Sequence, residues 1–181
     1  ITERKRMEDE LRRYSQQLEE LVENRTKDLR ESEERFRTSI ENMLDCFGIY
    51  QAIRDESGRI IDFRVEYVNA AACASNLMSK EEQIGKHLLE LLPAHRETGL
   101  FDDYCQLVET GEPLMKDALI YEDVYGKQRL RRVFDVRAVK LGDGFAAAWR
   151  DVTEHRRMEQ ALLRPVSATI WGKAMNFLIS R

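Results

Sequence analysis

The first 47 residues of the chain contain neither glycine nor proline, the two residues that most often end or bend a helix. Positions spaced by three and four residues form one stripe along a helix, and most of them are apolar here, although Arg25 and Ser32 also fall on the stripe and weaken it. The stripe is formed by Met7, Leu11, Tyr14, Leu18, Leu21, Val22, Leu29 and Phe36. The pattern predicts one helix over about residues 3–43, roughly 60 Å long at 1.5 Å per residue.

A helix with so narrow an apolar stripe is not stable alone, because helices in proteins gain most of their stability from packing. The spacing is typical of a coiled-coil seam, with a stutter between Tyr14 and Val22 where such a coil unwinds locally. We therefore expect a parallel homodimer. Its expected seam is Leu11, Leu18, Val22, Leu29 and Phe36. A lone solvated helix, a helix folded back on the domain and an antiparallel pair are the alternatives.

Composition argues against several classes of protein. The net charge is −4, whereas a nucleic-acid surface needs clustered excess cation. The sequence has no run of about 18 apolar residues, so it predicts no membrane segment. Cys46, Cys73 and Cys105 form no CxxC pair, and no histidine spacing indicates a metal site. We interpret the cysteines as reduced thiols of a cytoplasmic protein rather than as disulfides or zinc ligands.

From Cys46 onward, apolar and polar residues alternate, as in strands with one buried face. Strands are expected over residues 47–55, 59–70, 114–124, 128–141 and 145–152. Asn69 is a good N-cap for a short helix after the second strand. Ser79 and Glu82 form a capping box for another helix. A third helix is expected over about residues 95–110, ending at the sequence TGEP.

The order of two strands, three short helices and three strands predicts an α+β domain. It would hold a five-stranded antiparallel sheet with the helices on one face. A candidate ligand pocket lies between that face and the helices. Its candidate lining residues are Phe63, Val65, Tyr67, Leu77, Leu88, Phe101, Tyr104, Phe134, Val136, Phe145 and Trp149. An apolar lining with few polar groups fits a filled core as well as a small organic ligand.

The chain begins with a near copy of a segment close to its end. ITERKRMEDEL at residues 1–11 matches VTEHRRMEQAL at residues 152–162 at six of eleven positions, without a gap. Such a match indicates an internal repeat. In the second copy, Thr153 follows a strand directly and is expected to be the N-cap of an exit helix. Glu154 suits the positive end of that helix's dipole.

These features are similar to those of a PAS (Per-Arnt-Sim) sensor domain, over about residues 33–155. The resemblance rests on YVNAAA after the second strand, TGEPL before the third, and GFAAAWRDVTEHRRMEQAL at the end. The last motif is the most specific. Upstream, VENRTKDLRESEERFR at residues 22–37 resembles the signalling helix that typically precedes such domains.

The resemblance implies a division of the chain. It comprises a linker helix over 1–36, whose residues 1–6 end a preceding PAS domain, a PAS domain over 37–154, and the start of an exit helix over 155–163. The source would be a prokaryotic protein with tandem PAS domains, such as a sensor histidine kinase or a diguanylate cyclase. Its neighbouring PAS and output domains would be the partners. The alternative is a ligand-free module that dimerises and relays strain between neighbours.

The same resemblance bears on individual residues. Asp151 and Thr153 would couple movement of the sheet to the exit helix. Flavin-binding members carry an Asn-Cys motif, but Cys73 lies one helix too early for it. Oxygen sensors carry a haem-ligating histidine on the long helix, where this sequence has Leu100. His95 is expected to be exposed at the start of that helix. We expect neither haem nor flavin, and a non-covalent organic ligand stays open.

Catalysis has no support in the sequence, which holds no glycine-rich phosphate loop and no nucleophile motif. Residues 164–181 depart from the rest in character. They contain no acidic residue, and Pro165 interrupts the helical pattern. We interpret this tail as sequence foreign to the natural protein. The alternative is a native segment that docks Trp171 and Phe177 on the domain or on a partner.

Overall fold

The computed structural model describes residues 2–125 and 128–163, so the two interpretations of residues 164–181 lie outside the described residues. By its internal contacts the chain forms two units, one ending at Met43 and the other beginning at Leu44. A search of the described helices finds none with the length and apolarity that a bilayer crossing needs.

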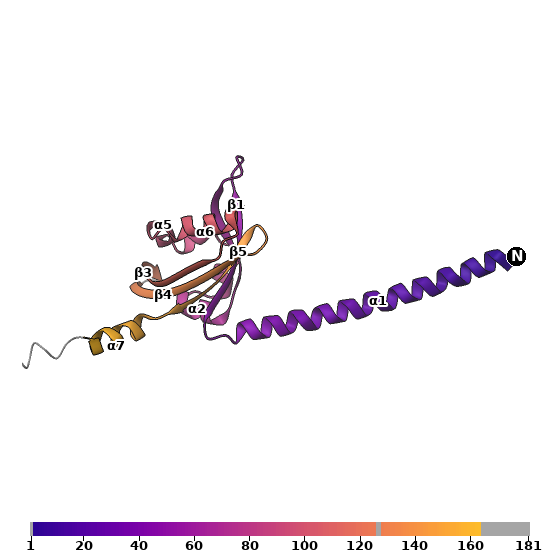
Figure 1. Cartoon of the computed structure of the whole chain (residues 1–181), viewed down its shortest axis with the longest axis horizontal. Helices are drawn as coiled ribbons and strands as arrows, with labels where there is room; N and C mark the ends of the chain where they lie inside the picture. Colours follow the sequence, from indigo (N-terminus) through magenta and orange to yellow (C-terminus); the bar gives the residue numbers. More distant parts are fainter. Residues whose placement is uncertain (1, 126–127, 164–181) are drawn as a thin grey trace, which may run out of the picture. The chain divides into compact units, whose positions relative to one another are not determined.

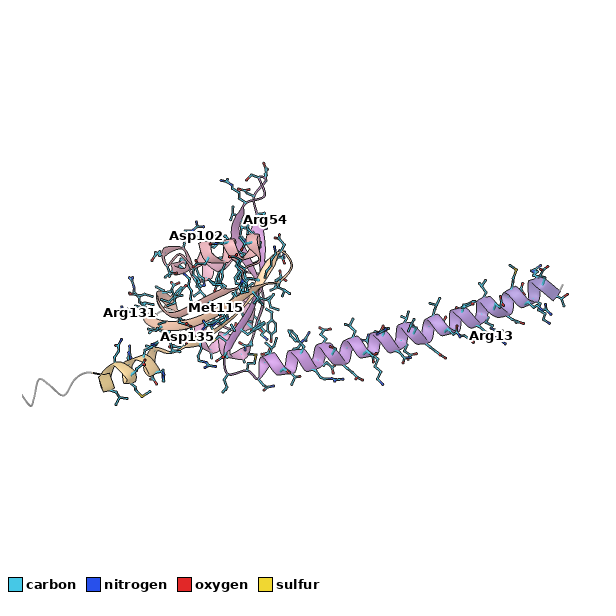
Figure 2. The ribbon with its side chains drawn as sticks, in the orientation of Figure 1. Arg13, Arg54, Asp102, Met115, Arg131 and Asp135 are labelled. Carbon is cyan, nitrogen blue, oxygen red and sulfur yellow. The ribbon has the colours of Figure 1, made fainter. Side chains whose placement is uncertain are left out.

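The first unit is the helix α1, Thr2–Glu41, which confirms the long helix predicted from the missing glycine and proline. Ion pairs one turn apart, such as Arg4 with Glu8 at 3.0 Å, support it. Each such pair contributes only about 0.3–0.5 kcal/mol. Figure 2 shows the side chains of α1, Arg13 among them, projecting all around the helix. The five predicted seam residues are more than half exposed, from 58% at Phe36 to 74% at Leu11.

The second unit contains a five-stranded antiparallel sheet in the order β2-β1-β5-β4-β3 (Figure 1). Its strands are β1 Cys46–Arg54, β2 Ile60–Val68, β3 Leu114–Tyr125, β4 Gln128–Lys140 and β5 Gly144–Asp151. The alternation of apolar and polar residues therefore predicted all five strands. The turn into β5 needs glycine, because a Cβ at Gly144 would lie 2.0 Å from the carbonyl oxygen of Tyr50.

Helices fill the connection between β2 and β3, and one helix follows β5. They are α2 Ala70–Asn76, α3 Lys80–Gln83, α4 Leu88–Leu91, α5 Ala94–Glu97, α6 Leu100–Thr110 and α7 Thr153–Leu163. The single helix expected over residues 95–110 is wrong. Gly99 has a φ of 75°, in the left-handed region, and it separates α5 from α6.

Two of the predicted helix starts are confirmed. The side chain of Asn69 accepts a hydrogen bond from the amide of Ala72, as an N-cap does. Ser79 and Glu82 exchange both bonds of a capping box, at 3.2 and 2.7 Å. Each cap satisfies helical N–H groups that have no partner within the helix.

The core of the second unit lies between the inner face of the sheet and α6. Phe63 and Phe145 are fully buried and meet edge to face, with ring centroids 4.9 Å apart. Tyr104 of α6 stacks on Phe145 at 4.1 Å, and Tyr50 of β1 stacks on it at 4.8 Å. Aromatic pairs at these separations add about 0.5–1.5 kcal/mol each beyond the area that they bury.

Candidate functional site

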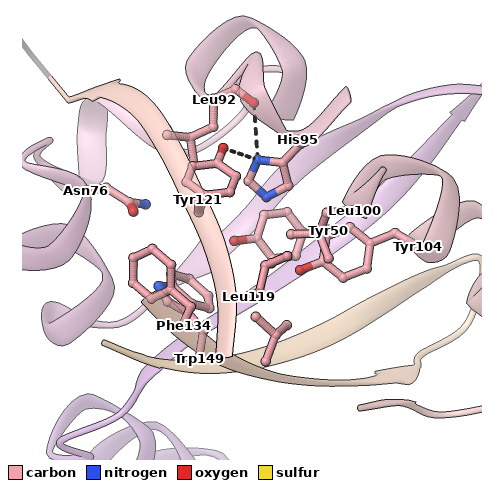
Figure 3. A pocket seen from close by; sticks show the side chains of 11 residues that line it. Tyr50, Asn76, Leu92, His95, Leu100, Tyr104, Leu119, Tyr121, Phe134 and Trp149 are labelled. Carbon is pink, nitrogen blue, oxygen red and sulfur yellow. Dashed lines mark hydrogen bonds between the residues drawn. The ribbon is translucent and has the colours of Figure 1, made fainter. Parts of the chain in front are cut away.

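A cavity adjoins this aromatic core, between the inner face of the sheet and helices α5 and α6 (Figure 3). Its lining residues are Tyr50, Asn76, Leu92, His95, Leu100, Tyr104, Leu119, Tyr121, Phe134, Val136 and Trp149. The space open to the centres of water-sized molecules is about 40 Å³. One water needs about 10–15 Å³ by this measure, so the cavity has room for about three waters.

The structure brings four of the eleven predicted pocket residues together in this wall: Tyr104, Phe134, Val136 and Trp149. Five others, Phe63, Val65, Leu88, Phe101 and Phe145, are buried in the core rather than at the cavity surface. The inner face of the sheet is thus shared between a packed core and a small opening. The remaining two, Tyr67 and Leu77, lie elsewhere.

Tyr67 lies on the outer face of the sheet, where alternation in the sequence placed it inside. Tyr50 pairs with Val65, but its neighbour Ile49 pairs with Tyr67, so Glu66 is an extra residue in β2. Such a bulge reverses the side on which the following residues point. The ring of Tyr67 instead packs near Phe47, with centroids 6.4 Å apart.

Leu77 also lies off the cavity and is 50% exposed. It ends α2 in the left-handed conformation, with a φ of 55°, and its amide bonds back to the carbonyl groups of Ala74 and Cys73. This conformation turns the chain at the end of the helix. The apolar side chain is therefore not part of the pocket that the sequence predicted.

His95 was expected to be exposed, but it is buried in the wall of the cavity and is only 8% exposed. Its Nδ1 lies 3.1 Å from the carbonyl oxygen of Leu92 and 2.6 Å from the hydroxyl oxygen of Tyr121. Burial lowers the pKa of His95 to about 4, because a charged imidazolium would lose its hydration. The side chain is therefore neutral at pH 7.

Behind His95 lies a buried carboxylate that sequence reasoning missed. Asp123 of β3 accepts hydrogen bonds from the hydroxyl of Tyr121 at 2.9 Å and from the amide of Ala94 at 3.0 Å. It also accepts a bond from the amide of Val124 at 2.7 Å. These bonds tie the start of α5 to β3 and satisfy a carboxylate that is 6% exposed. The available signal was an aspartate on the inward-facing side of a strand.

Tyr50 and Tyr104 bring two phenol groups to the cavity. Burial raises the pKa of both side chains, so both hydroxyls stay protonated. A phenol of this kind donates one hydrogen bond and also accepts. The cavity thus combines apolar walls with a few uncharged polar groups, which is the usual composition of small-molecule sites. Among the described residues, no group of three His, Cys, Asp or Glu side chains is placed to hold a metal ion.

The three cysteines are free thiols. Cys46 is buried, and burial raises its pKa. Burial also raises the pKa of Cys105 to about 11. Since the thiolate is the reactive form, neither position has the environment of a reactive cysteine.

A second candidate site, the predicted signal junction, lies where β5 meets α7. The carboxylate of Asp151 accepts a hydrogen bond from the amide of Thr153 at 2.9 Å and another from its hydroxyl. The predicted role of Thr153 as N-cap is therefore wrong, since Thr153 is the first helical residue and its amide is satisfied by the side chain of Asp151, which precedes the helix. The Thr153 hydroxyl oxygen instead accepts a bond from the amide of Val133 in β4, at 2.9 Å.

The backbone reinforces this junction. The amide of Val152 donates to the carbonyl oxygen of Val133 at 2.8 Å, and Val152 is buried. Strand β5, the junction and α7 are thus fixed to β4 by two adjacent hydrogen bonds at Val133. A rotation of α7 about this point would break one or both of them.

The chain is similar to known proteins in sequence and in structure. A family model described as PAS fold matches residues 53–157. Among solved structures, a domain of the sensory box sensor histidine kinase/response regulator from Geobacter sulfurreducens is 20% identical, with a TM-score of 0.49. The match covers 68% of this chain and 96% of that one. The PAS domain of a protein from Colwellia psychrerythraea is 18% identical, with a TM-score of 0.47 and coverages of 67% and 97%.

The PAS domain of nitrogen regulation protein NR(II) from Vibrio parahaemolyticus is 15% identical, with a TM-score of 0.41. That match covers 62% of this chain and 93% of the other. A comparison with curated proteins gave no match.

Proposed function

The chain belongs to the PAS fold family, and we propose that it is a sensory and signal-relay domain of a larger cytoplasmic signalling protein. The output of that protein would be a histidine kinase or a diguanylate cyclase carried by another domain. The chain itself would supply no catalytic residue. Neighbouring PAS and output domains would be its partners.

One observation carries the proposal: strand β5 contributes residues both to the cavity wall and to the junction with α7. Trp149 lies in the cavity wall, and Asp151, two residues later on the same strand, caps α7. The segment from Phe145 to Leu163 contains no glycine or proline that would act as a hinge. A shift of Trp149 would therefore pass along the strand to the Asp151–Thr153 junction and on to α7.

Dimerisation through α1 is the second part of the proposal. The exposed stripe with coiled-coil spacing supports it, because burying such a stripe against a second copy would remove apolar surface from water. A coiled coil with a stutter changes its winding locally. Movement transmitted between domains would then become rotation of paired helices.

The proposal includes neither haem nor flavin. A space of about 40 Å³ is far smaller than either ring system, and Leu100 offers no ligand atom for iron. The small cavity also favours the alternative function, a ligand-free module that dimerises and relays strain. The two functions differ in whether occupation of the cavity changes the output.

The deciding experiment uses the full-length parent protein. Output activity is measured for the natural sequence, for Asp151→Ala, and for Glu56→Ala, a control in the exposed β1–β2 turn. We expect Asp151→Ala to alter the output or its response to stimulus, and Glu56→Ala to leave both unchanged. An unchanged output in Asp151→Ala would refute relay through the junction.

A further inference from the structure

The cavity wall contains a hydrogen-bond acceptor that the domain does not itself use. Leu92 offers His95 a carbonyl oxygen, which only accepts, so Nδ1 carries the imidazole proton. The Tyr121 hydroxyl gives its own proton to Asp123, which leaves it as an acceptor toward Nδ1. In the neutral ring, Nε2 therefore has a free lone pair.

This second nitrogen faces the cavity. Figure 3 shows Nε2 turned away from Leu92 and Tyr121 and toward Tyr50 and Tyr104. The rings of His95 and Tyr104 have centroids 6.0 Å apart. Within residues 2–125 and 128–163, Nε2 has no hydrogen-bond donor, although His95 is only 8% exposed. An acceptor that faces a cavity in this way favours an occupant that donates a hydrogen bond.

The neighbouring groups define the rest of the occupant. The hydroxyl ends of Tyr50 and Tyr104 point into the same space as Nε2, and both groups are able to donate as well as accept (Figure 3). Leu100, Leu119 and Val136 provide apolar wall. No side chain of the wall carries a charge at pH 7, so a charged occupant would be buried without a counter-ion at high cost.

We propose that this cavity binds an uncharged molecule of about four non-hydrogen atoms, of the size and polarity of a small amide or alcohol. The molecule donates a hydrogen bond to Nε2 of His95 and accepts one from the hydroxyl of Tyr104. Its apolar part contacts Leu100, Leu119 and Val136. This inference rests on the proposed sensory function, because the same cavity wall includes Trp149.

Four probes test the chemistry: acetamide, 2-propanol, acetone and acetate, which have equal numbers of non-hydrogen atoms. Each is titrated into the full chain labelled with ¹³C and ¹⁵N at pH 7. The ¹⁵N resonance of Nε2 and the ¹³C resonances of the tyrosine rings are followed by NMR. We expect saturable shifts with acetamide and 2-propanol. Acetone, which has no donor, should bind about tenfold more weakly, the loss of roughly one hydrogen bond. Acetate should give no saturable shift.

Two matched variants locate the contact. Tyr104→Phe removes one oxygen and keeps the stacking on Phe145, so acetamide affinity should fall about five- to tenfold. Tyr67→Phe removes a hydroxyl from the outer face of the sheet and should leave that affinity unchanged. If Tyr104→Phe perturbs the spectrum beyond the cavity, Tyr50→Phe provides a second test of the same wall, with a fall in affinity expected.

Several results would overturn the inference. Binding of acetone as tight as that of acetamide would show apolar filling only. The absence of a saturable shift with every probe would show a cavity that holds only water. If Tyr104→Phe and Tyr67→Phe both bind acetamide as tightly as the natural sequence does, the contact with the Tyr104 hydroxyl is excluded. If no probe binds and Asp151→Ala still alters the output of the parent protein, the inference fails and the proposed function stands.

Discussion

Asp45 and Arg150, 105 positions apart in the sequence, form a two-point ion pair where the neighbouring strands β1 and β5 lie side by side. Nε and Nη2 of Arg150 lie 2.6 and 2.7 Å from the two carboxylate oxygens of Asp45. Asp45 directly precedes β1, and Arg150 directly precedes the junction residue Asp151. The carbonyl oxygen of Asp45 also accepts a bond from the side chain of Asn69, at 3.0 Å. The pair therefore joins the start of the sheet domain to its exit.

The first prediction concerns the titration of Asp45. Hydrogen bonds from Arg150 hold the pKa of Asp45 below its usual range, so Arg150→Gln should raise it. A carboxylate whose pKa is lowered by folding stabilises the folded protein at pH values above its pKa in the unfolded chain. This stabilisation is lost as the pH falls through the pKa of the folded protein. Carboxyl ¹³C shifts measured between pH 2 and pH 6 report the change. Arg137→Gln, which removes the partner of Asp117, is the control and should leave Asp45 unchanged.

The second prediction concerns His95 and the pH dependence of stability. Between the ordinary value of 6.5 and about 4, the unfolded chain gains a proton at this histidine and the folded protein does not. The free energy of unfolding should therefore fall as pH falls through this window, by about 3 kcal/mol in total from this residue. Urea unfolding at several pH values measures the slope.

His95→Gln should flatten that slope, because glutamine does not titrate. His155→Gln, at an exposed position of α7, is the matched control and should keep the natural slope. Slopes are compared rather than absolute stabilities, since His95→Gln also changes packing and hydrogen bonding in the wall. Equal slopes in all three proteins would contradict the buried, neutral state of His95.

Local patterns in the sequence were sufficient for the elements of the fold. The stripe in α1, the alternation at Phe134 and Val136, and the caps at Asn69 and Ser79 depend on nearby residues only. Each of these predictions is confirmed because helix and strand geometry repeat over a few residues.

The site was less predictable because its contacts depend on irregularities and on distant segments. One extra residue in β2 moved Tyr67 to the outer face. The break at Gly99 created a separate α5 and let His95 turn inward toward Tyr121. The hydroxyl oxygen of Thr153 accepts a hydrogen bond from the amide of Val133, twenty positions earlier, rather than from an amide of its own helix. No local spacing encodes such contacts.

The third prediction concerns dimerisation through α1. Replacing Leu18 and Val22 together by glutamate should convert a dimer into monomers, because like charges on a buried seam cost several kcal/mol. Gln16→Glu with Asn24→Glu adds the same charge on the opposite side of the helix and should leave the dimer intact. Sedimentation equilibrium measures the mass of each protein. A monomeric natural chain at high concentration would exclude the predicted seam.

The last prediction concerns the two hydrogen bonds that join α7 to β4. Thr153→Val keeps the size of the side chain but removes the acceptor of the Val133 amide, so it should lower the free energy of unfolding by about 1 kcal/mol. Thr153→Ser keeps the hydroxyl and should retain most of the stability. Hydrogen exchange at the Val133 amide should become faster in the valine variant and stay slow in the serine variant.

In the parent protein, the valine variant should also weaken the response of the output to stimulus, since α7 would then follow β5 and β4 less closely. A valine variant with faster exchange at Val133 but a full response would show that this bond only stabilises the fold, and that movement reaches α7 by another route.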